Sequence, residues 1–310
     1  MVKKIGLLGL SDGNGHPYSF SAIINGYNDE HLKKSSWEVI YRYIKKRDPS
    51  EMGFENIRIT HVWTQEKEIS QNLALACKID HVLDKYEDMI GKVDAVIIAR
   101  DDYENHLDMA KLYLEAGLKV FVDKPLTVDV QELLYFKDYL INGQLMSMSG
   151  MRYAIELDDI RSNLKDYGEL KIIQSSVIND WEKYGIHLLD AVLGILPNSP
   201  VSIEYIKTTS DMYLLNFEDG LTWTINILGN APKTFNINVW GITKRASFNI
   251  EDNFSMFRRM LWRFGQLVSQ NEVYYRPHDT LVTLCLLIGG QISKKEERKV
   301  YLKEFNNILN

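Results

Sequence analysis

Two stretches of the chain carry residue types suited to binding a nucleotide and moving a proton. The first is "LLGLSDGNGHPYS" (residues 7–19), where an apolar run passes into a glycine-rich loop and a helix start. Phosphate binding needs close backbone approach and free N–H groups at a helix start, and small residues allow both. We therefore predict that a dinucleotide pyrophosphate is held by Gly9, Ser11, Asp12, Gly13 and Asn14.

The spacing of this loop departs from the usual G-x-G-x-x-G pattern. Counting from Gly9, the second and third glycine positions hold Ser11 and Asn14. Asn tolerates a left-handed backbone, and Ser11 adds a hydroxyl donor, so neither residue disqualifies the loop. A glycine-rich turn without a ligand is the alternative. The position after the first strand of an α/β domain favours the cofactor loop.

The second stretch is "KVFVDKP" (residues 119–125), a strand stopped by Pro125. Lys124 stands at the carboxyl end of this strand, where α/β sheets bind their ligands. A lysine can remove or supply a hydroxyl proton when burial or a neighbouring charge brings its pKa near the working pH. Taken alone, a Lys-Pro pair also fits an ordinary surface turn.

The end of the second strand gives no clear cofactor preference. Thr64 and Gln65 stand where a carboxylate would bind the ribose of NAD or a basic residue would bind the phosphate of NADP. We include Thr64 and also Arg100, which follows the strand at 94–99, among the cofactor contacts. The predicted cofactor is NAD or NADP.

The composition indicates an ordinary globular protein with two domains. The chain has 310 residues, is 45% hydrophobic and carries a net charge of −6, which excludes a basic nucleic-acid-binding protein. The two cysteines lie in apolar segments and are expected to be buried free thiols, and no Cys/His cluster indicates a metal. No run approaches the roughly 18 apolar residues of a membrane span, so we expect a cytoplasmic protein.

Alternating strand and helix patterns fill residues 1–149 and predict a doubly wound parallel sheet, that is, a Rossmann domain. In residues 150–310, six β segments are expected between 169 and 250, and the last five follow one another from residue 202 without intervening helices, which favours a largely antiparallel sheet. Helices are expected over 181–196, 254–269 and 278–292. The fold class is therefore α/β, with a second α+β domain for substrate binding and oligomerisation.

Three segments resemble the glucose–fructose oxidoreductase / inositol dehydrogenase / MocA family. Residues 93–126 are similar to its strand, helix and "EKP" pattern, with Asp123 in place of the family glutamate. "YGIHLLD" (184–190) is similar to the family's "D.G.H..D", and "GMRYA" (150–154) to the start of its second domain. The matching residues are His106, Ala116, Gly117, Val120, Lys124, Pro125, Gly185, His187 and Asp190.

The resemblance implies a nicotinamide-dependent oxidoreductase for a sugar, cyclitol or nucleotide sugar. It implies that Lys124 lies beside the nicotinamide and the substrate hydroxyl, and that His187 is the proton-transfer partner. It also implies a homodimer or homotetramer formed through the second sheet. Candidate substrate contacts are Arg152, Tyr153, Lys183 and Asp190; Asp190 could instead orient the imidazole or be a surface carboxylate.

Lys183 stands where the family usually has an aspartate, one turn before the histidine. A protonated lysine cannot accept a proton there. It could lower the pKa of Lys124, pair with an anionic substrate, or mark the loss of redox catalysis. The alternative function is therefore a catalytically silent sensor that binds a dinucleotide on the same fold.

Overall fold

A computed structural model describes residues 1–310, and the chain forms two compact units. The first unit consists of Met1–Thr127, Asp138–Met148 and Phe257–Pro277. The second consists of Val128–Lys137, Ser149–Met256 and His278–Asn310. The first unit thus contains a segment from late in the chain, and the predicted domain boundary after residue 149 stays a prediction.

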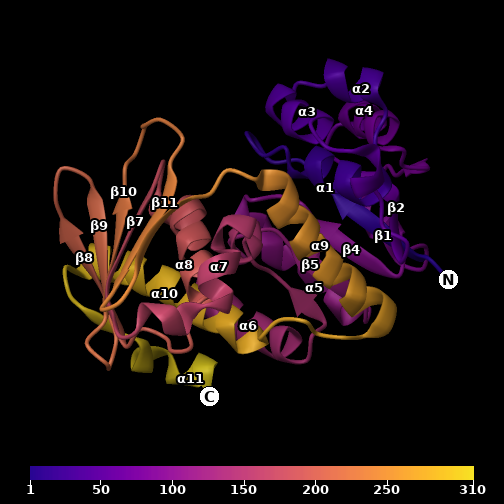
Figure 1. Ribbon diagram of the computed structural model, residues 1–310. Coiled ribbons are helices and arrows are strands. Elements are labelled where there is room, and N and C mark those ends of the chain that lie inside the picture. Colours follow the sequence, from indigo (N-terminus) through magenta and orange to yellow (C-terminus); the bar gives the residue numbers. More distant parts are fainter. The chain divides into compact units, whose positions relative to one another are not determined.

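The first unit is built on a parallel sheet with strand order β3-β2-β1-β4-β5-β6 (Figure 1). The order reverses between β1 and β4, so the carboxyl ends of these strands form the switch point at which such sheets bind ligands. This confirms the predicted Rossmann architecture. The strands are β1 Lys3–Leu8, β2 Ile57–Trp63, β3 His81–Val82, β4 Ala95–Ile98, β5 Lys119–Val122 and β6 Leu145–Met146.

The central strands are apolar because both faces of the sheet are covered. Every residue of β4 is buried, as expected for a parallel strand packed between two helix layers. The helices that begin in or belong to this half of the chain are α1 His16–Asn25, α2 Asp29–Lys34, α3 Glu38–Lys45, α4 Lys67–Cys77, α5 His106–Glu115 and α6 Val130–Ile141. The polar insertion predicted at 28–56 forms α2 and α3.

Helix α6 begins directly after Asp129, which is its N-cap. The Asp129 carboxylate accepts the backbone N–H groups of Gln131 at 2.7 Å and Glu132 at 3.0 Å. A carboxylate at this place satisfies donors that the first helical turn leaves open.

The second unit contains a seven-stranded sheet with order β12-β11-β7-β10-β9-β8-β13. All its pairs are antiparallel except β7 with β10, which confirms the predicted open, largely antiparallel sheet. The strands are β7 Leu170–Val177, β8 Ser202–Lys207, β9 Asp211–Asn216, β10 Thr222–Ile227, β11 Phe235–Gly241, β12 Arg245–Asn249 and β13 Val300–Tyr301.

One face of this second sheet packs on helices and the other does not. Inward side chains such as Trp223 and Tyr213 are fully buried beneath the helices, whereas side chains at alternate positions are half-exposed. The helices are α7 Asp158–Ser162, α8 Ile186–Leu193, α9 Asn253–Gln270, α10 Pro277–Glu296 and α11 Asn306–Leu309. Residues 257–270 of α9 belong to the first unit.

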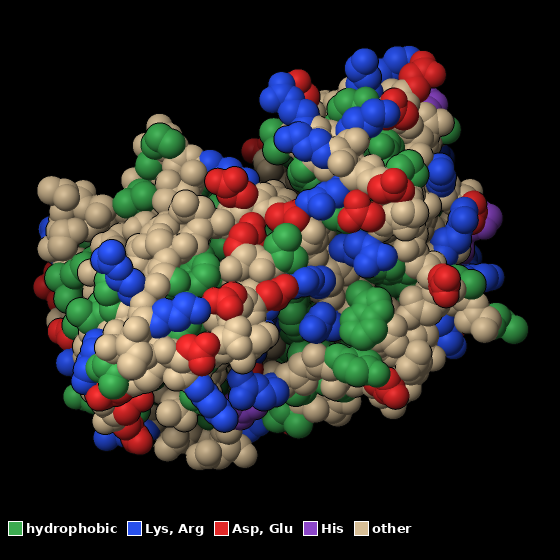
Figure 2. Space-filling model, viewed as in Figure 1, with side chains coloured by type: hydrophobic (Ala, Val, Ile, Leu, Met, Phe, Trp, Pro, Cys, Tyr) green, Lys and Arg blue, Asp and Glu red, His purple; other side chains and the backbone are tan.

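The surface has no segregated charge on the face drawn in Figure 2, where acidic and basic side chains are interspersed. None of the helices is both long and apolar enough to span a lipid bilayer. No group of three or more His, Cys, Asp or Glu side chains is placed to hold a metal ion. Cys77 and Cys285 are both buried free thiols, as the sequence predicts.

Candidate active site

The loop after β1 anchors its polar side chains on two carboxylates. Ser11 is buried, and its Oγ donates to Asp101 Oδ1 at 2.7 Å. Asn14 is also buried; its Nδ2 donates to Asp123 Oδ2 at 3.1 Å, and its Oδ1 accepts the N–H of His16 at 2.8 Å. These two side chains therefore fix the shape of the loop, which leaves backbone groups for a phosphate.

A cavity of about 450 Å³ opens beside this loop. Gly13 has a φ of +72° and open space where a Cβ would stand, so a ligand can approach its backbone closely. Gly9 has a packing role instead, because a Cβ there would lie 2.6 Å from Pro17 of α1. The cavity is lined by Leu10, Ser11, Asp12, Gly13, Trp37, Gln65, Glu66 and Ile69.

The predicted contact Thr64 does not line this cavity. Its hydroxyl donates to the carbonyl oxygen of Glu66 at 2.8 Å and lies 2.8 Å from Ser70 Oγ, so it closes the corner between β2 and α4. Gln65 and Glu66 form the cavity edge instead. Glu66, two residues beyond Thr64, thus places a carboxylate at the cavity edge after the second strand.

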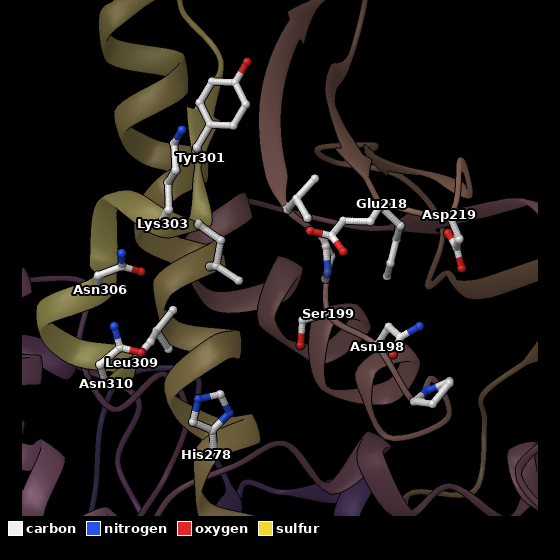
Figure 3. A pocket seen from close by; sticks show the side chains of 15 residues that line it. Asn198, Ser199, Glu218, Asp219, His278, Tyr301, Lys303, Asn306, Leu309 and Asn310 are labelled. Atoms are coloured by element: carbon white, nitrogen blue, oxygen red, sulfur yellow. The ribbon is translucent and has the colours of Figure 1, made fainter.

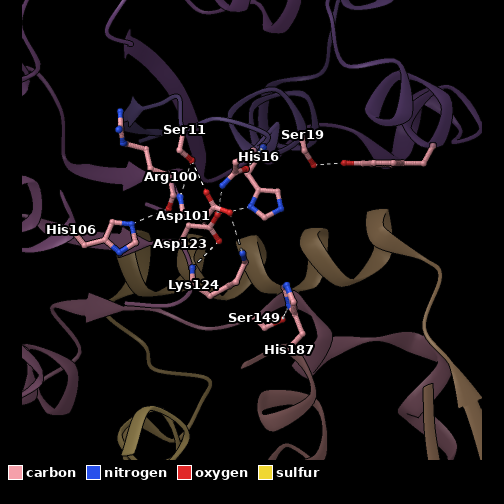
Figure 4. A network of polar contacts seen from close by, with 12 residues as sticks. Ser11, His16, Ser19, Arg100, Asp101, His106, Asp123, Lys124, Ser149 and His187 are labelled. Carbon is pink, nitrogen blue, oxygen red and sulfur yellow. Dashed lines mark hydrogen bonds and ion pairs between the residues drawn. The ribbon is translucent and has the colours of Figure 1, made fainter. Parts of the chain in front are cut away.

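Lys124 is buried just beyond the end of β5, with 5% of its surface exposed. Its Nζ lies 3.8 Å from Asp101 Oδ2, and the other oxygen of Asp101 accepts the Ser11 hydroxyl (Figure 4). The ammonium group is therefore linked through one carboxylate to the loop that follows β1. The contacts from Lys124 through Asp101 to Ser11 thus join the segments that follow β5, β4 and β1.

Asp123 precedes Lys124 and is almost completely buried. Its carboxylate lies 2.5 Å from His16 Nδ1 and accepts the Lys124 backbone N–H at 2.9 Å (Figure 4). Burial opposes its charge, but the charges of His16 and Lys124 and the hydrogen bonds from His16 and Asn14 outweigh burial and lower the pKa of Asp123. A carboxylate at this position thus fixes the backbone beneath Lys124.

Arg100 is buried at the end of β4, and its Nε donates to Asp102 Oδ1 at 2.9 Å. Its Nη2 also contacts Asp102, whereas its buried Nη1 has no hydrogen-bond partner. A buried guanidinium nitrogen with no partner beside a cofactor loop is a donor suited to an anion. Among the predicted cofactor contacts, Arg100 thus has a buried donor nitrogen, Nη1, without a hydrogen-bond partner.

His106, one of the residues that match the family pattern, contacts two loops of this site. It is fully buried, with Nδ1 at 3.0 Å from the Leu126 carbonyl and Nε2 at 3.0 Å from the Arg100 carbonyl. Burial lowers its pKa. Its contacts tie the segment after β4 to the segment after Lys124, so its role is to hold the two loops in place.

In the second unit, His187 lies on α8 and is mostly buried. Its Nδ1 lies 2.6 Å from Ser149 Oγ (Figure 4). Asp190 lies one turn further along α8, and its Oδ2 accepts the Ser149 backbone N–H at 2.5 Å. Asp190 therefore orients His187 through Ser149.

Arg152 and Asp190, both predicted substrate contacts, belong to one buried ion network. Arg152 Nη1 lies 3.4 Å from Asp190 Oδ1, and its Nη2 is paired with Asp279. Thr283 Oγ1 donates to Asp190 Oδ1 at 3.2 Å. Burial raises the pKa of Asp190 although these partners oppose the shift. Tyr153, the neighbouring predicted contact, is also buried.

The segment before His187 is a π-helix, Trp181–Gly185, followed by α8, which ends at Leu193. The prediction of one α-helix over 181–196 was therefore wrong in its first turn and its end. The wide turn accommodates the Trp181 indole, because a Cβ on Gly185 would lie 2.5 Å from that ring. Asp180 caps the turn by accepting the Lys183 N–H at 2.7 Å.

Aromatic rings surround His187. The centroid of Tyr184 lies 5.9 Å and that of Phe235 lies 5.7 Å from the imidazole, both edge-on. Phe235 also lines a cavity of about 530 Å³ together with Lys233, Thr234, Asn249, Ile250 and Glu251. Sequence analysis missed these residues because they come from a hairpin far along the chain.

A larger cavity of about 1050 Å³ lies elsewhere in the second unit. Figure 3 shows Glu218 and Asp219 on one wall, and Tyr301 and Lys303 on the other. It contains none of the predicted site residues, and its charged side chains are all exposed. We therefore do not place the candidate active site in this cavity.

Comparison with known proteins gives one family model. Residues 41–149 match the family described as "Oxidoreductase family, NAD-binding Rossmann fold", Gfo/Idh/MocA. This range includes Lys124 and strands β2 to β6, whereas β1 and the loop that follows it lie outside the range. Within this range, the chain is similar to the Rossmann domain of the Gfo/Idh/MocA oxidoreductase family. The family description agrees with the predicted dinucleotide cofactor.

Solved structures share the fold of this chain along its length. A scyllo-inositol dehydrogenase from Lactobacillus casei with bound NAD(H) and scyllo-inositol has a TM-score of 0.75 at 14% identity, covering 98% of this chain and 100% of that one. A putative myo-inositol dehydrogenase from Sinorhizobium meliloti 1021 has a TM-score of 0.73 at 15% identity, covering 97% and 100%. No curated protein sequence matches.

Three residues that sequence analysis missed share one property. Asp101, His16 and Ser149 each act through another polar side chain, and none has a motif of its own. Glu66 alone could have been predicted from the sequence, since it is an acidic residue close to the end of the second strand. The other three become visible only as contacts.

Proposed function

We propose that this protein is an NAD-dependent oxidoreductase that transfers a hydride between nicotinamide and a carbinol carbon of a ring polyol. The observation that carries the proposal is the placing of Lys124. It is a buried ammonium at the carboxyl end of β5, linked through Asp101 to the loop beside the cavity of the Rossmann unit. Similarity to this family supports the redox class.

The residues of the Rossmann unit fit a dinucleotide. The cavity beside Gly13 admits close backbone approach, and the unpartnered Nη1 of Arg100 offers a donor for a phosphate. Bound nicotinamide would accept or donate the hydride. Lys124 would donate a hydrogen bond or a proton to the reacting oxygen of the substrate, with Asp101 holding the ammonium in position.

The substrate proposal rests on the second unit and on the similar structures. The rings of Tyr184 and Phe235 beside His187 give an apolar wall that suits the C–H face of a cyclic polyol. One similar structure holds scyllo-inositol and another myo-inositol. We propose a sugar or cyclitol, with His187, Lys183 and Tyr153 among its contacts.

The test is direct. Purified protein is incubated with NAD and, separately, NADP and a panel of inositols, aldoses, uronic acids and nucleotide sugars, and reduced nicotinamide is followed by absorbance. We expect turnover with at least one cyclic polyol. Tight binding of NADH without any turnover, in either direction, would instead identify the silent sensor.

The cavity edge predicts a preference for NAD over NADP. Asp12 and Glu66 are exposed carboxylates there, and the lining contains no lysine or arginine. A carboxylate accepts a hydrogen bond from the ribose 2′-hydroxyl but repels a 2′-phosphate. We expect Glu66→Arg to shift the NADPH-to-NADH affinity ratio toward NADPH by at least about tenfold, roughly 1.4 kcal/mol.

Fluorescence titration of both reduced cofactors checks this cofactor prediction. Glu68→Arg is the matched control, since it places the same charge on the same helix but outside the cavity lining. Equal affinity of the unaltered protein for NADH and NADPH would contradict the preference.

We also propose that the open face of the second sheet forms a homodimer or homotetramer contact. One row across this face contains Gln174, Thr224 and Leu214, which are aligned in register on β7, β10 and β9. Charged residues are depleted at the centre of such interfaces. We expect Thr224→Lys to yield a smaller species by light scattering after gel filtration, and Thr208→Lys in an exposed turn to leave the size unchanged.

A further inference from the structure

The hydroxyl of Ser149 controls one side of the His187 imidazole. Its Oγ lies 2.6 Å from Nδ1 and accepts the backbone N–H of Met151 at 3.1 Å. Ser149 is 1% exposed, so no bulk water reaches these bonds. Ser149 Oγ is therefore a buried hydrogen-bond partner of Nδ1, the imidazole nitrogen that it faces.

Ser149 is itself fixed from two directions. Its backbone N–H donates to Asp190 Oδ2 at 2.5 Å, and it caps the short turn Gly150–Tyr153. Asp190 is in turn held by Thr283 and Arg152. The Ser149 hydroxyl thus belongs to a buried hydrogen-bond network, which keeps it close to Nδ1 of His187.

The hydrogen-bonding capacity of a hydroxyl group decides the tautomer. Oγ has one proton and two lone pairs, and one lone pair already accepts the Met151 N–H. If Oγ donates its proton to Nδ1, the hydroxyl both donates and accepts a hydrogen bond, and the neutral imidazole carries its proton on Nε2. If Nδ1 carries the proton, the hydroxyl proton has no acceptor in a buried site, which is unfavourable.

We infer that Ser149 holds neutral His187 as the Nε2–H tautomer, which makes His187 a hydrogen-bond donor to the substrate oxygen and not a general base. Ser149 is then a positioning residue, with Asp190 behind it. The role toward substrate rests on the proposed function; the tautomer does not. Under this assignment, proton transfer falls to Lys124, and His187 stabilises the oxygen as charge develops on it.

The tautomer is tested in the full chain without substrate. Long-range proton–nitrogen correlation spectra are recorded on protein labelled with ¹⁵N-histidine at alkaline pH, and His187 is assigned with His187→Gln. We expect a protonated Nε2 and an unprotonated Nδ1. In Ser149→Ala we expect a mixture of tautomers, whereas Ser149→Thr keeps the single one. The control Ser202→Ala removes another buried serine of the same unit and leaves the His187 signals unchanged.

A protonated Nδ1 in the unaltered protein overturns the inference, whatever the variants do. Unchanged His187 signals in folded Ser149→Ala overturn the role of Ser149. Once a polyol substrate has been identified, we expect Ser149→Ala to lower kcat by about tenfold or more, with little change in NADH affinity. An unaltered kcat overturns the kinetic role. Because the spectra need no turnover, failure of the proposed function and failure of this inference give different results.

Discussion

Replacing Lys124 with methionine lowers kcat by roughly 100- to 10,000-fold, the range usual for loss of a proton-transfer group. Methionine keeps much of the length and the apolar stem but removes the ammonium that pairs with Asp101. NADH affinity, measured by fluorescence, stays within about threefold because the cavity beside Gly13 does not include Lys124 among its lining residues. The measurement is the initial rate with the best polyol of the panel.

Lys119→Met is the matched control. Lys119 begins the same strand and is half-buried, and its Nζ donates to the Gly143 carbonyl at 2.9 Å, away from the loop after β1. We expect it to leave kcat nearly unchanged. If Lys124→Met retained full turnover, or if both variants lost it equally, Lys124 would not be the proton-transfer residue.

Replacing Trp181 with alanine destabilises the protein by about 3–5 kcal/mol, as measured for large aromatic side chains removed from packed cores. The indole is 2% exposed and stacks on Tyr213 with centroids 3.8 Å apart. Its Nε1 donates to the Leu287 carbonyl at 2.8 Å. Gly185 and Gly290 leave the slot that the ring fills, since a Cβ on either would lie within 2.6 Å of it.

Urea denaturation followed by circular dichroism gives the free energy of unfolding. Trp262→Ala, at a tryptophan that is 38% exposed, serves as the control and is expected to cost far less. Because Trp181 starts the π-helix that leads to His187, we also expect lower kcat in any folded fraction. Equal destabilisation by the two substitutions would contradict the packing argument.

The sequence predicted the Rossmann sheet and the strands of the second sheet because both follow from local patterns. The buried run of β4 and the alternation along β9 and β10 report directly which faces are covered. The π-helix before α8 could not be predicted, because its wide turn depends on Trp181 packing against Gly290, more than a hundred residues away.

The sequence by itself predicted which residues are suited to carry the proposed chemistry. The glycine-rich loop, Lys124 after its strand and His187 in its helix all have local signals, because a ligand site at the end of a strand or on a helix leaves a short pattern. Tertiary structure alone decided what each of them does. Asp101 meets Lys124, and Ser149 meets His187, through hydrogen bonds between segments distant in the chain. Such bonds depend on distances in the folded state, and no spacing in a sequence records them.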